Sequence, residues 1–189
     1  MPIKSIFVTV GTTSFDNLIA TSIKEDFVEA ALDTGHNLVV LQIGRGASPP
    51  ELYQLESVQI TQCNDETWTF TLLSNSRKAS LRYDCYRFKP NISNDINYAS
   101  VVISHAGAGS IFESLRKSKP LIVSINTSLA DNHQLELAHK LNEQKHLLCG
   151  FHEDVPSLLR KLQNESLIPL PPVDHTAFLK CLDSVMEFQ

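Results

Sequence analysis

The sequence predicts an α/β protein built on a Rossmann-like, doubly wound parallel sheet. Short runs rich in β-branched residues, such as residues 3–10, 38–43 and 101–104, alternate with segments of helical spacing. Runs that are apolar on both faces are typical of parallel strands covered by helices on both sides. Several runs end in small turns that contain glycine, as expected where a strand passes into a helix. At 189 residues the chain is long enough for one well-buried domain and short for two.

The predicted elements follow in βα order along most of the chain. The first strand is followed by a helix over residues 16–32, whose apolar residues recur at helical spacing and which ends at Gly35. Further strands are predicted at 38–43, 101–104, 120–125 and 146–149. Helices are predicted at 90–99, 108–117, 131–144 and 154–163, with a short helical turn at 49–52.

Residues 62–88 interrupt this order and predict a β-hairpin insertion. Residues 67–72 alternate strictly, which places Trp68, Phe70 and Leu72 on one face of a strand. Residues 74–77 resemble a turn, and residues 81–88 return as a second strand. We expect the apolar face to cover the domain's own core rather than to bind a partner.

Composition and charge argue against several classes of function. The net charge of −5 disfavours nucleic-acid binding, which needs a clustered basic surface. No segment approaches the roughly 20 apolar residues of a transmembrane helix, and the N-terminus runs into a strand without a secretory signal. The cysteines Cys63, Cys85, Cys149 and Cys181 are scattered and lack zinc-site spacing. We therefore expect free thiols, no metal site and a cytoplasmic protein.

Three glycine-containing turns follow predicted strands: Gly11-Thr12-Thr13, Gly44-Arg45-Gly46 and Gly107-Ala108-Gly109-Ser110. In an open α/β sheet such turns share the carboxyl edge, where ligands bind. None of them is a complete G-x-G-x-x-G or a Walker A motif, so nicotinamide and P-loop functions are disfavoured. A G-x-S-x-G motif is also absent, so Ser110 is not predicted to be a hydrolase nucleophile.

Residues 103–115 carry the strongest functional signal. They read as strand, glycine-rich turn and helix N-terminus. The first N–H groups of a helix have no helical partner and the helix dipole adds positive potential, so such a turn suits a phosphate or diphosphate. Glu113 lies about one turn into the helix, where its carboxylate can reach ribose hydroxyls. This arrangement predicts a nucleotide site.

A second polar cluster, Asp131-Asn132-His133-Gln134, follows the strand at 120–125. Four consecutive polar side chains at the start of a helix are able to bind the hydroxyls of one sugar. The alternative is that Asp131 only caps the helix and the other three side chains are solvated. The cluster alone does not decide between these two interpretations.

Together, these pieces resemble a known family. The matching stretches are residues 7–13, 42–46, 102–111, 119–123 and 131–134. In this order they are similar to the catalytic subunit of the two-component UDP-N-acetylglucosamine transferase of the dolichol pathway. The likeness covers nearly the whole chain and is weakest over residues 47–80 and after residue 150.

The resemblance implies a fold, an activity and a partner. The chain would be the C-terminal, donor-binding half of a GT-B glycosyltransferase, with the donor domain at residues 1–168. It would transfer the second GlcNAc from UDP-GlcNAc onto GlcNAc-diphosphodolichol, a lipid-linked acceptor, by an inverting reaction. The chain has no D-x-D carboxylate pair, which fits a metal-independent enzyme without a cofactor. A membrane-anchored subunit would bind the acceptor and recruit the chain to the cytosolic face of the endoplasmic reticulum.

The resemblance also implies roles for individual residues. The diphosphate would be held by Gly11, Thr12, Thr13, Gly107, Ala108, Gly109 and Ser110. The GlcNAc would be bound by Asn132, His133 and Gln134, and the uracil by Phe88 and Lys89. Glu113 and His133 are the predicted catalytic residues, with Glu113 on the ribose. The general base is expected on the partner's side of the cleft, so His105, although it belongs to the donor site, is assigned a supporting role.

Two other functions stay open at this point. One is a sugar-nucleotide-binding regulatory module without transfer activity, and the other is a bacterial-type two-subunit glycosyltransferase. Residues 169–189 are predicted to form a proline-rich connector and an amphipathic C-terminal helix that packs either on this domain or on the partner.

Overall fold

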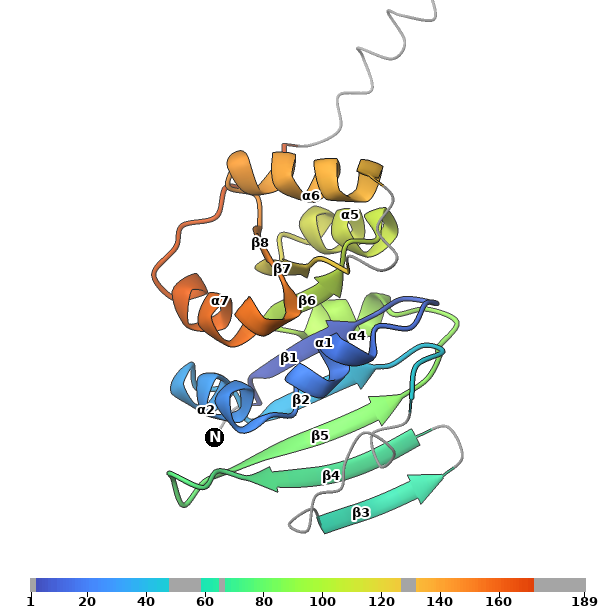
Figure 1. The fold of residues 1–189 in the computed structure, drawn as a ribbon, viewed down its shortest axis with the longest axis vertical. Helices are drawn as coiled ribbons and strands as arrows, with labels where there is room; N and C mark the ends of the chain where they lie inside the picture. Colours follow the sequence, from blue (N-terminus) through green and yellow to red (C-terminus); the bar gives the residue numbers. More distant parts are fainter. Residues whose placement is uncertain (1–2, 48–58, 65–66, 127–131, 172–189) are drawn as a thin grey trace, which may run out of the picture.

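The computed structural model describes residues 3–47, 59–64, 67–126 and 132–171 (Figure 1). The strands are β1 (Ser5–Thr9), β2 (Leu38–Gln42), β3 (Gln59–Asn64), β4 (Thr67–Leu73), β5 (Ser80–Tyr86), β6 (Val101–His105), β7 (Leu121–Ser124) and β8 (Leu148–Gly150). They form one sheet in the order β3-β4-β5-β2-β1-β6-β7-β8. Every neighbouring pair from β5 to β8 is parallel. The predicted Rossmann-like parallel sheet is confirmed.

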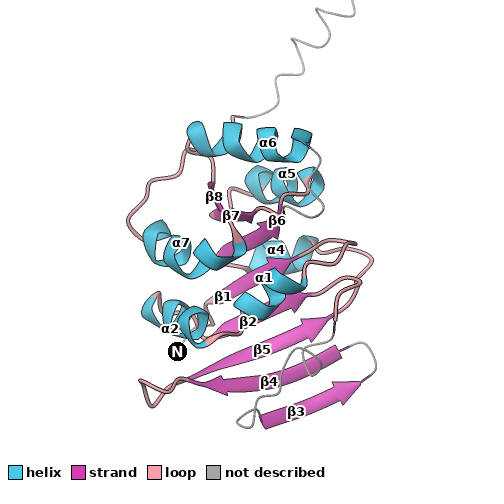
Figure 2. Ribbon diagram, in the orientation of Figure 1, coloured by secondary structure: helices cyan, strands magenta, loops and turns pink. Residues whose placement is uncertain are grey.

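Helices cover both faces of this sheet (Figure 2). They are α1 (Asp16–Thr21), α2 (Glu25–Asp33), α4 (Ser93–Tyr98), α5 (Ala108–Arg116), α6 (Asn132–Glu143), the 3-10 turn η1 (His152–Asp154) and α7 (Val155–Leu162). Apolar residues of α1, α2 and α7 pack on one face, and those of α4, α5 and α6 pack on the other. Two separate apolar cores result, as expected for a doubly wound fold.

The single helix predicted over residues 16–32 is wrong: the structure has two helices, α1 and α2. The break follows Ser22, whose hydroxyl is buried and donates to Leu18 O at 2.8 Å. Its own carbonyl accepts a hydrogen bond from the Tyr83 hydroxyl at 2.9 Å. A serine that bonds back to the helix, with its carbonyl taken by another strand, favours termination there. Lys24 is then extended and α2 begins at Glu25.

The predicted insertion is larger than a hairpin. β4 and β5 are antiparallel, as predicted, but β3 adds a further antiparallel strand at the sheet edge that the sequence did not indicate. Trp68, Phe70 and Leu72 are buried in the core beneath α1 and α2, and Phe70 stacks on Tyr83 with ring centroids 4.9 Å apart. The expectation that this face covers the domain's own core is confirmed.

The parallel strands bring their carboxyl ends to one edge of the sheet. β1 lies between β2 and β6. The chain therefore adds β2 on one side of β1 and later adds β6 on its other side. Such a switch point leaves a crevice at the carboxyl edge. The predicted glycine turns after β1 and β6 flank this point. The short helical turn at 49–52 and the C-terminal helix lie outside the described residues. In the described ranges no helix is long and apolar enough to cross a membrane.

Candidate functional site

The turns after β1 and β6 lie side by side at the switch point. Thr9 and Ser104, near the ends of these strands, are paired in register. Gly11 has φ +63°, a left-handed conformation that L side chains rarely adopt, which explains glycine at this position. The structure therefore brings together the two predicted diphosphate turns.

His105 packs against both turns. A Cβ added to Gly11 would lie 2.6 Å from His105 Cε1, and one added to Gly107 would lie 2.3 Å from Nε2. The Nδ1 atom lies 3.4 Å from Thr9 O. Burial lowers the pKa of His105, which favours a neutral imidazole at neutral pH. The ring therefore lies between the two turns, and its supporting role in the site stays a prediction.

The N-terminus of α5 is open to solvent. Gly107 is the N-cap residue and provides no side-chain cap, and the first intrahelical bond runs from Ile111 N to Gly107 O at 3.1 Å. Ala108 and Gly109 are exposed, and a Cβ added to Gly109 would meet nothing within 4 Å. The N–H groups of this first turn, including that of Ser110, are therefore available to an anion.

Glu113 lies next to this helix start. A shallow hollow is lined by Ala108, Gly109, Phe112, Glu113, Arg116 and Lys117. The Glu113 side chain is half-buried, and its Oε1 lies 3.3 Å from Lys117 Nζ. Lys117 Nζ also donates to Ser93 O at 2.9 Å, which anchors the lysine. Two of the predicted phosphate residues, Ala108 and Gly109, therefore share one hollow with Glu113.

The turn after β2 supports the turn after β1. Gly44 has φ +57°, and a Cβ there would lie 2.2 Å from Thr13 O. Arg45 N donates to Thr13 O at 3.0 Å. The Thr13 hydroxyl donates to Val10 O at 2.8 Å, so its proton serves the turn itself. Thr12 is exposed beside it.

Phe88 and Lys89 follow β5 at the same edge. Phe88 is exposed. Lys89 is engaged in the protein, because its Nζ donates to both carboxylate oxygens of Asp95 at 2.9 Å and lies 4.0 Å from the centroid of the Tyr86 ring. Of the two residues predicted to contact the uracil, Phe88 is therefore the one whose side chain is more available to a ligand.

Asn132, His133 and Gln134 form the first turn of α6, which follows β7 in the chain. The predicted helix is present, but the side chains of these three residues are outside the described part of the structure, as is Asp131. Their assignment to the sugar stays a prediction.

Two polar residues of this edge were not predicted as site residues. Gln42 is 3% exposed and bonds to the Gly11 turn. Asp16 Oδ1 accepts a hydrogen bond from Ala47 N at 3.0 Å and so holds the end of the Gly44 turn. The sequence contains one indication of this role: Gln42 is an amide at the end of an otherwise apolar strand. A buried amide needs hydrogen-bond partners, so such a residue is expected to bond to nearby backbone.

Residues 5–178 match the family described as Glycosyltransferase family 28 C-terminal domain. The chain belongs to this family. Similar proteins named UDP-N-acetylglucosamine transferase subunit ALG13 include that of Saccharomyces cerevisiae, 31% identical over 95% of this chain and 94% of the relative. The Candida glabrata protein is 31% identical over 96% of this chain and 98% of the relative. The predicted family resemblance is confirmed.

The human protein of the same name is 46% identical over 144 residues, which are 76% of this chain. This chain spans only 11% of the human relative and 10% of the mouse relative.

Solved structures support the same fold. The NMR solution structure of ALG13 has a TM-score of 0.70 at 28% identity, with 95% of both chains covered. MurG of Acinetobacter baumannii has a TM-score of 0.57 at 14% identity, over 86% of this chain and 41% of MurG. The fold is therefore that of the Rossmann-like C-terminal domain of GT-B glycosyltransferases.

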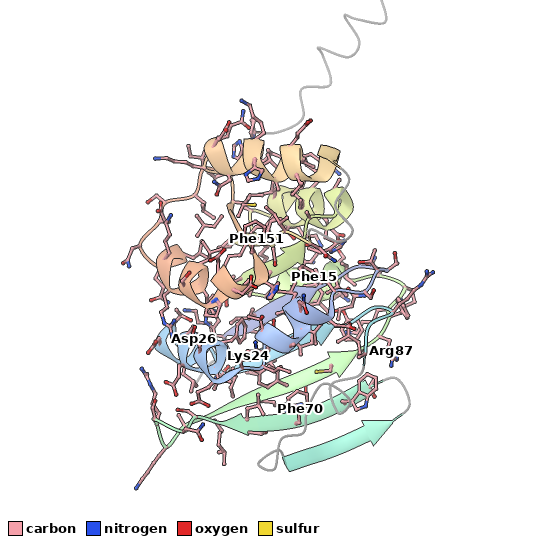
Figure 3. The ribbon with its side chains drawn as sticks, in the orientation of Figure 1. Phe15, Lys24, Asp26, Phe70, Arg87 and Phe151 are labelled. Carbon is pink, nitrogen blue, oxygen red and sulfur yellow. The ribbon has the colours of Figure 1, made fainter. Side chains whose placement is uncertain are left out.

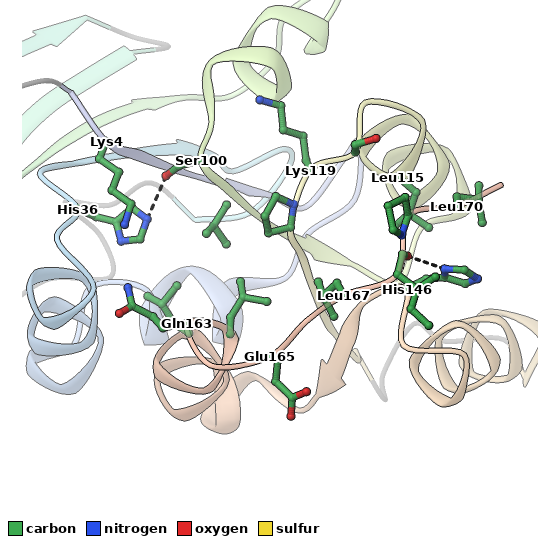
Figure 4. Close-up of a pocket in the computed structure, with 17 residues that line it drawn as sticks. Lys4, His36, Ser100, Leu115, Lys119, His146, Gln163, Glu165, Leu167 and Leu170 are labelled. Atoms are coloured by element: carbon green, nitrogen blue, oxygen red, sulfur yellow. Dashed lines mark hydrogen bonds between the residues drawn. The ribbon is translucent and has the colours of Figure 1, made fainter. Parts of the chain in front are cut away.

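A separate cavity of about 360 Å³ lies at the opposite, amino edge of the sheet (Figure 4). Its lining includes Lys4, His36 and Ser100 together with Leu159 and Leu162. The His36 ring is buried and bonded within the protein, with Nε2 3.0 Å from Ser100 Oγ. The parallel strands end at the other edge, where ligands bind in open α/β sheets, so this cavity lies away from the predicted site.

The buried His36 predicts a loss of stability in acid. Burial lowers the pKa of His36 to about 4, and the nearby Lys4 adds to the effect. Between pH 6.5 and 4 the unfolded chain binds a proton that the folded chain does not, so unfolding becomes easier by about 3 kcal/mol as pH falls through this range. Urea unfolding at a series of pH values measures this change. The His36→Asn variant should give a flatter profile, and an equal slope in both proteins would contradict the assignment to His36.

Proposed function

We propose that this chain is the donor-binding catalytic subunit of a UDP-GlcNAc transferase. It transfers the second GlcNAc onto GlcNAc-diphosphodolichol at the cytosolic face of the endoplasmic reticulum. The observation that carries the proposal is the open N-terminus of α5. It lies beside the Gly11 turn and about one helical turn before Glu113. The names of the related proteins support the sugar nucleotide and the subunit character.

In this proposal the diphosphate of UDP binds at the two turns. The N–H groups of Ala108, Gly109 and Ser110 donate to phosphate oxygens, and the positive end of the α5 dipole stabilises their charge. Gly11 and Thr12 approach the diphosphate from the neighbouring strand. Gly109, with open space above its Cα, lets the phosphate come close to the backbone.

The remaining parts of the donor are assigned to the surrounding residues. The carboxylate of Glu113 accepts hydrogen bonds from the ribose hydroxyls. Phe88 packs against the uracil, with Lys89 at its edge. The first turn of α6, with Asn132, His133 and Gln134, binds the GlcNAc.

The chemistry is a single displacement at the anomeric carbon. The acceptor hydroxyl oxygen forms the new bond from the face opposite UDP, the bond from that carbon to the diphosphate oxygen breaks, and UDP leaves with the electron pair. Fixed dipoles at the α5 N-terminus stabilise the negative charge that develops on the leaving group. The acceptor proton passes to a base on the partner's side of the cleft.

A membrane-anchored partner subunit supplies the acceptor half of the enzyme. The related proteins named as transferase subunits support this arrangement, because a subunit acts together with a partner chain. The chain alone binds the donor, and the complex transfers it.

The test is a transfer assay with UDP-GlcNAc and a GlcNAc-diphospholipid, run on this chain alone and with a candidate membrane subunit. We expect transfer only from the pair. Saturable donor binding without transfer from any pair would favour the regulatory module, and absence of donor binding would reject the site itself.

A further inference from the structure

Gln42 joins two backbone segments of the candidate site. It lies at the carboxyl end of β2 and is almost fully buried. Its Nε2 donates to Gly11 O at 2.5 Å and to Arg87 O at 3.1 Å. Its Oε1 accepts from Gly11 N at 3.0 Å, and the Thr9 hydroxyl also donates to Oε1. One amide therefore holds both polar groups of Gly11 and a carbonyl at the end of β5.

Arg87 extends this connection to the third turn. Its carbonyl also accepts a hydrogen bond from Gly44 N at 3.2 Å, and its Nη1 donates to Gly46 O at 2.8 Å. The guanidinium lies 5.5 Å from the centroid of the Trp68 ring, which fixes it over β4. Figure 3 shows Arg87 at the carboxyl end of β5. Phe88 is the next residue along the chain.

We propose that Gln42 is a positioning residue that fixes the Gly11 turn relative to the segment carrying Phe88. The inference rests on the proposed function, in which these two segments bind the diphosphate and the uracil of one nucleotide. Gln42 contacts neither ligand group. It sets the distance between the two places where the donor is held.

The chemistry of the position requires a primary amide. The Gly11 N–H donates to this side chain and the Gly11 carbonyl accepts from it, so one side chain has to provide both an acceptor and a donor. Leucine provides neither. Glutamate provides acceptors only when ionised, and its charge would face two carbonyl oxygens. Protonated glutamic acid regains one donor.

The first experiment compares Gln42→Leu with Gln163→Leu. Gln163 Nε2 also donates to a backbone carbonyl, that of Thr34 at 3.1 Å, but at the opposite edge of the sheet. UDP binding is measured by calorimetry on the free chain, and steady-state kinetics are measured on the reconstituted pair. We expect Gln42→Leu to weaken UDP binding and raise KM for UDP-GlcNAc by about tenfold, with kcat within about twofold. Gln163→Leu should leave both unchanged.

The second experiment uses Gln42→Glu, which keeps the side-chain size. Burial beside two carbonyl oxygens raises the pKa of such a carboxyl, so the protonated form is regained as pH falls. We expect UDP affinity, expressed relative to wild type at the same pH, to be lowest at pH 8 and to recover toward pH 5.5.

Three results overturn the inference. Equal UDP affinity for wild type and Gln42→Leu would do so, as would equal losses in both leucine variants or a Gln42→Glu deficit independent of pH. In each of these cases the proposed function stands, because wild type binds UDP. Failure of wild type to bind UDP would reject the proposed function, and this inference with it.

Discussion

Replacing Glu113 by alanine is expected to lower transfer by the reconstituted enzyme about a hundredfold or more, with the fold retained. In the proposed complex this carboxylate accepts both ribose hydroxyls, and charged hydrogen bonds of that kind contribute about 1.5–3 kcal/mol each. In the free protein the side chain makes a partly exposed ion pair with Lys117, which stabilises the fold by less than about 1 kcal/mol. Function should therefore be lost without a matching loss of stability.

A matched control separates the two effects. Glu165 forms a similar ion pair with Lys161 four residues away, with 3.5 Å between Oε1 and Nζ, at the amino edge of the sheet. Glu165→Ala should retain normal transfer. Thermal unfolding of both variants is compared with wild type. Near-normal activity of Glu113→Ala, or equal activity loss in both variants, would contradict the ribose assignment.

Replacing Gly11 by alanine is expected to destabilise the protein by about 3 kcal/mol and to abolish donor binding. The φ of +63° costs an L-residue about 1–2 kcal/mol. The new Cβ would also lie 2.6 Å from His105 Cε1, which forces the ring or the turn to move. Overpacking of a buried site typically costs about 1–3 kcal/mol. Chemical denaturation measures the change in unfolding free energy.

Double variants with His105→Ala divide this cost into its two parts. Removing the ring should relieve the steric part for Gly11→Ala and leave the backbone part. For Gly107→Ala, whose φ is −75°, nearly all of the cost should vanish in the same background. Gly109→Ala serves as a control, because its Cβ meets no atom within 4 Å. Additive effects of the Gly107 and His105 changes would show that the ring does not set the turn spacing.

Local sequence patterns predicted much of this fold. Apolar strands, the glycine turns and α5 each follow from a few neighbouring residues, so residues 101–117 were placed correctly. The break between α1 and α2 was missed because it depends on the Tyr83 hydroxyl, which bonds to Ser22 O from a distant strand. β3 was missed because its sequence, with Gln59, Gln62 and Asn64, is too polar to give a strand signal.

In the candidate site, too, the features set by neighbouring residues were predicted and those set by distant residues were missed. The turn proposed to bind the diphosphate is a local motif, and the sequence placed Gly109 and Glu113 one helical turn apart. The role of Gln42 depends on the Arg87 carbonyl, which follows β5 and lies 45 residues away in the chain. Nothing in the sequence around Lys89 indicated its ion pair with Asp95. Contacts between distant strands have to be seen in the fold.

The central claim is that a sugar nucleotide binds at the Gly11 and α5 turns. An NMR titration of the ¹⁵N-labelled chain with UDP-GlcNAc tests it most directly, because it reports on each backbone N–H. We predict saturable shifts centred on the amides of Gly11 and of Ala108, Gly109 and Ser110. Shifts centred instead on the amino-edge cavity around His36, or no shifts at millimolar donor, would contradict the account.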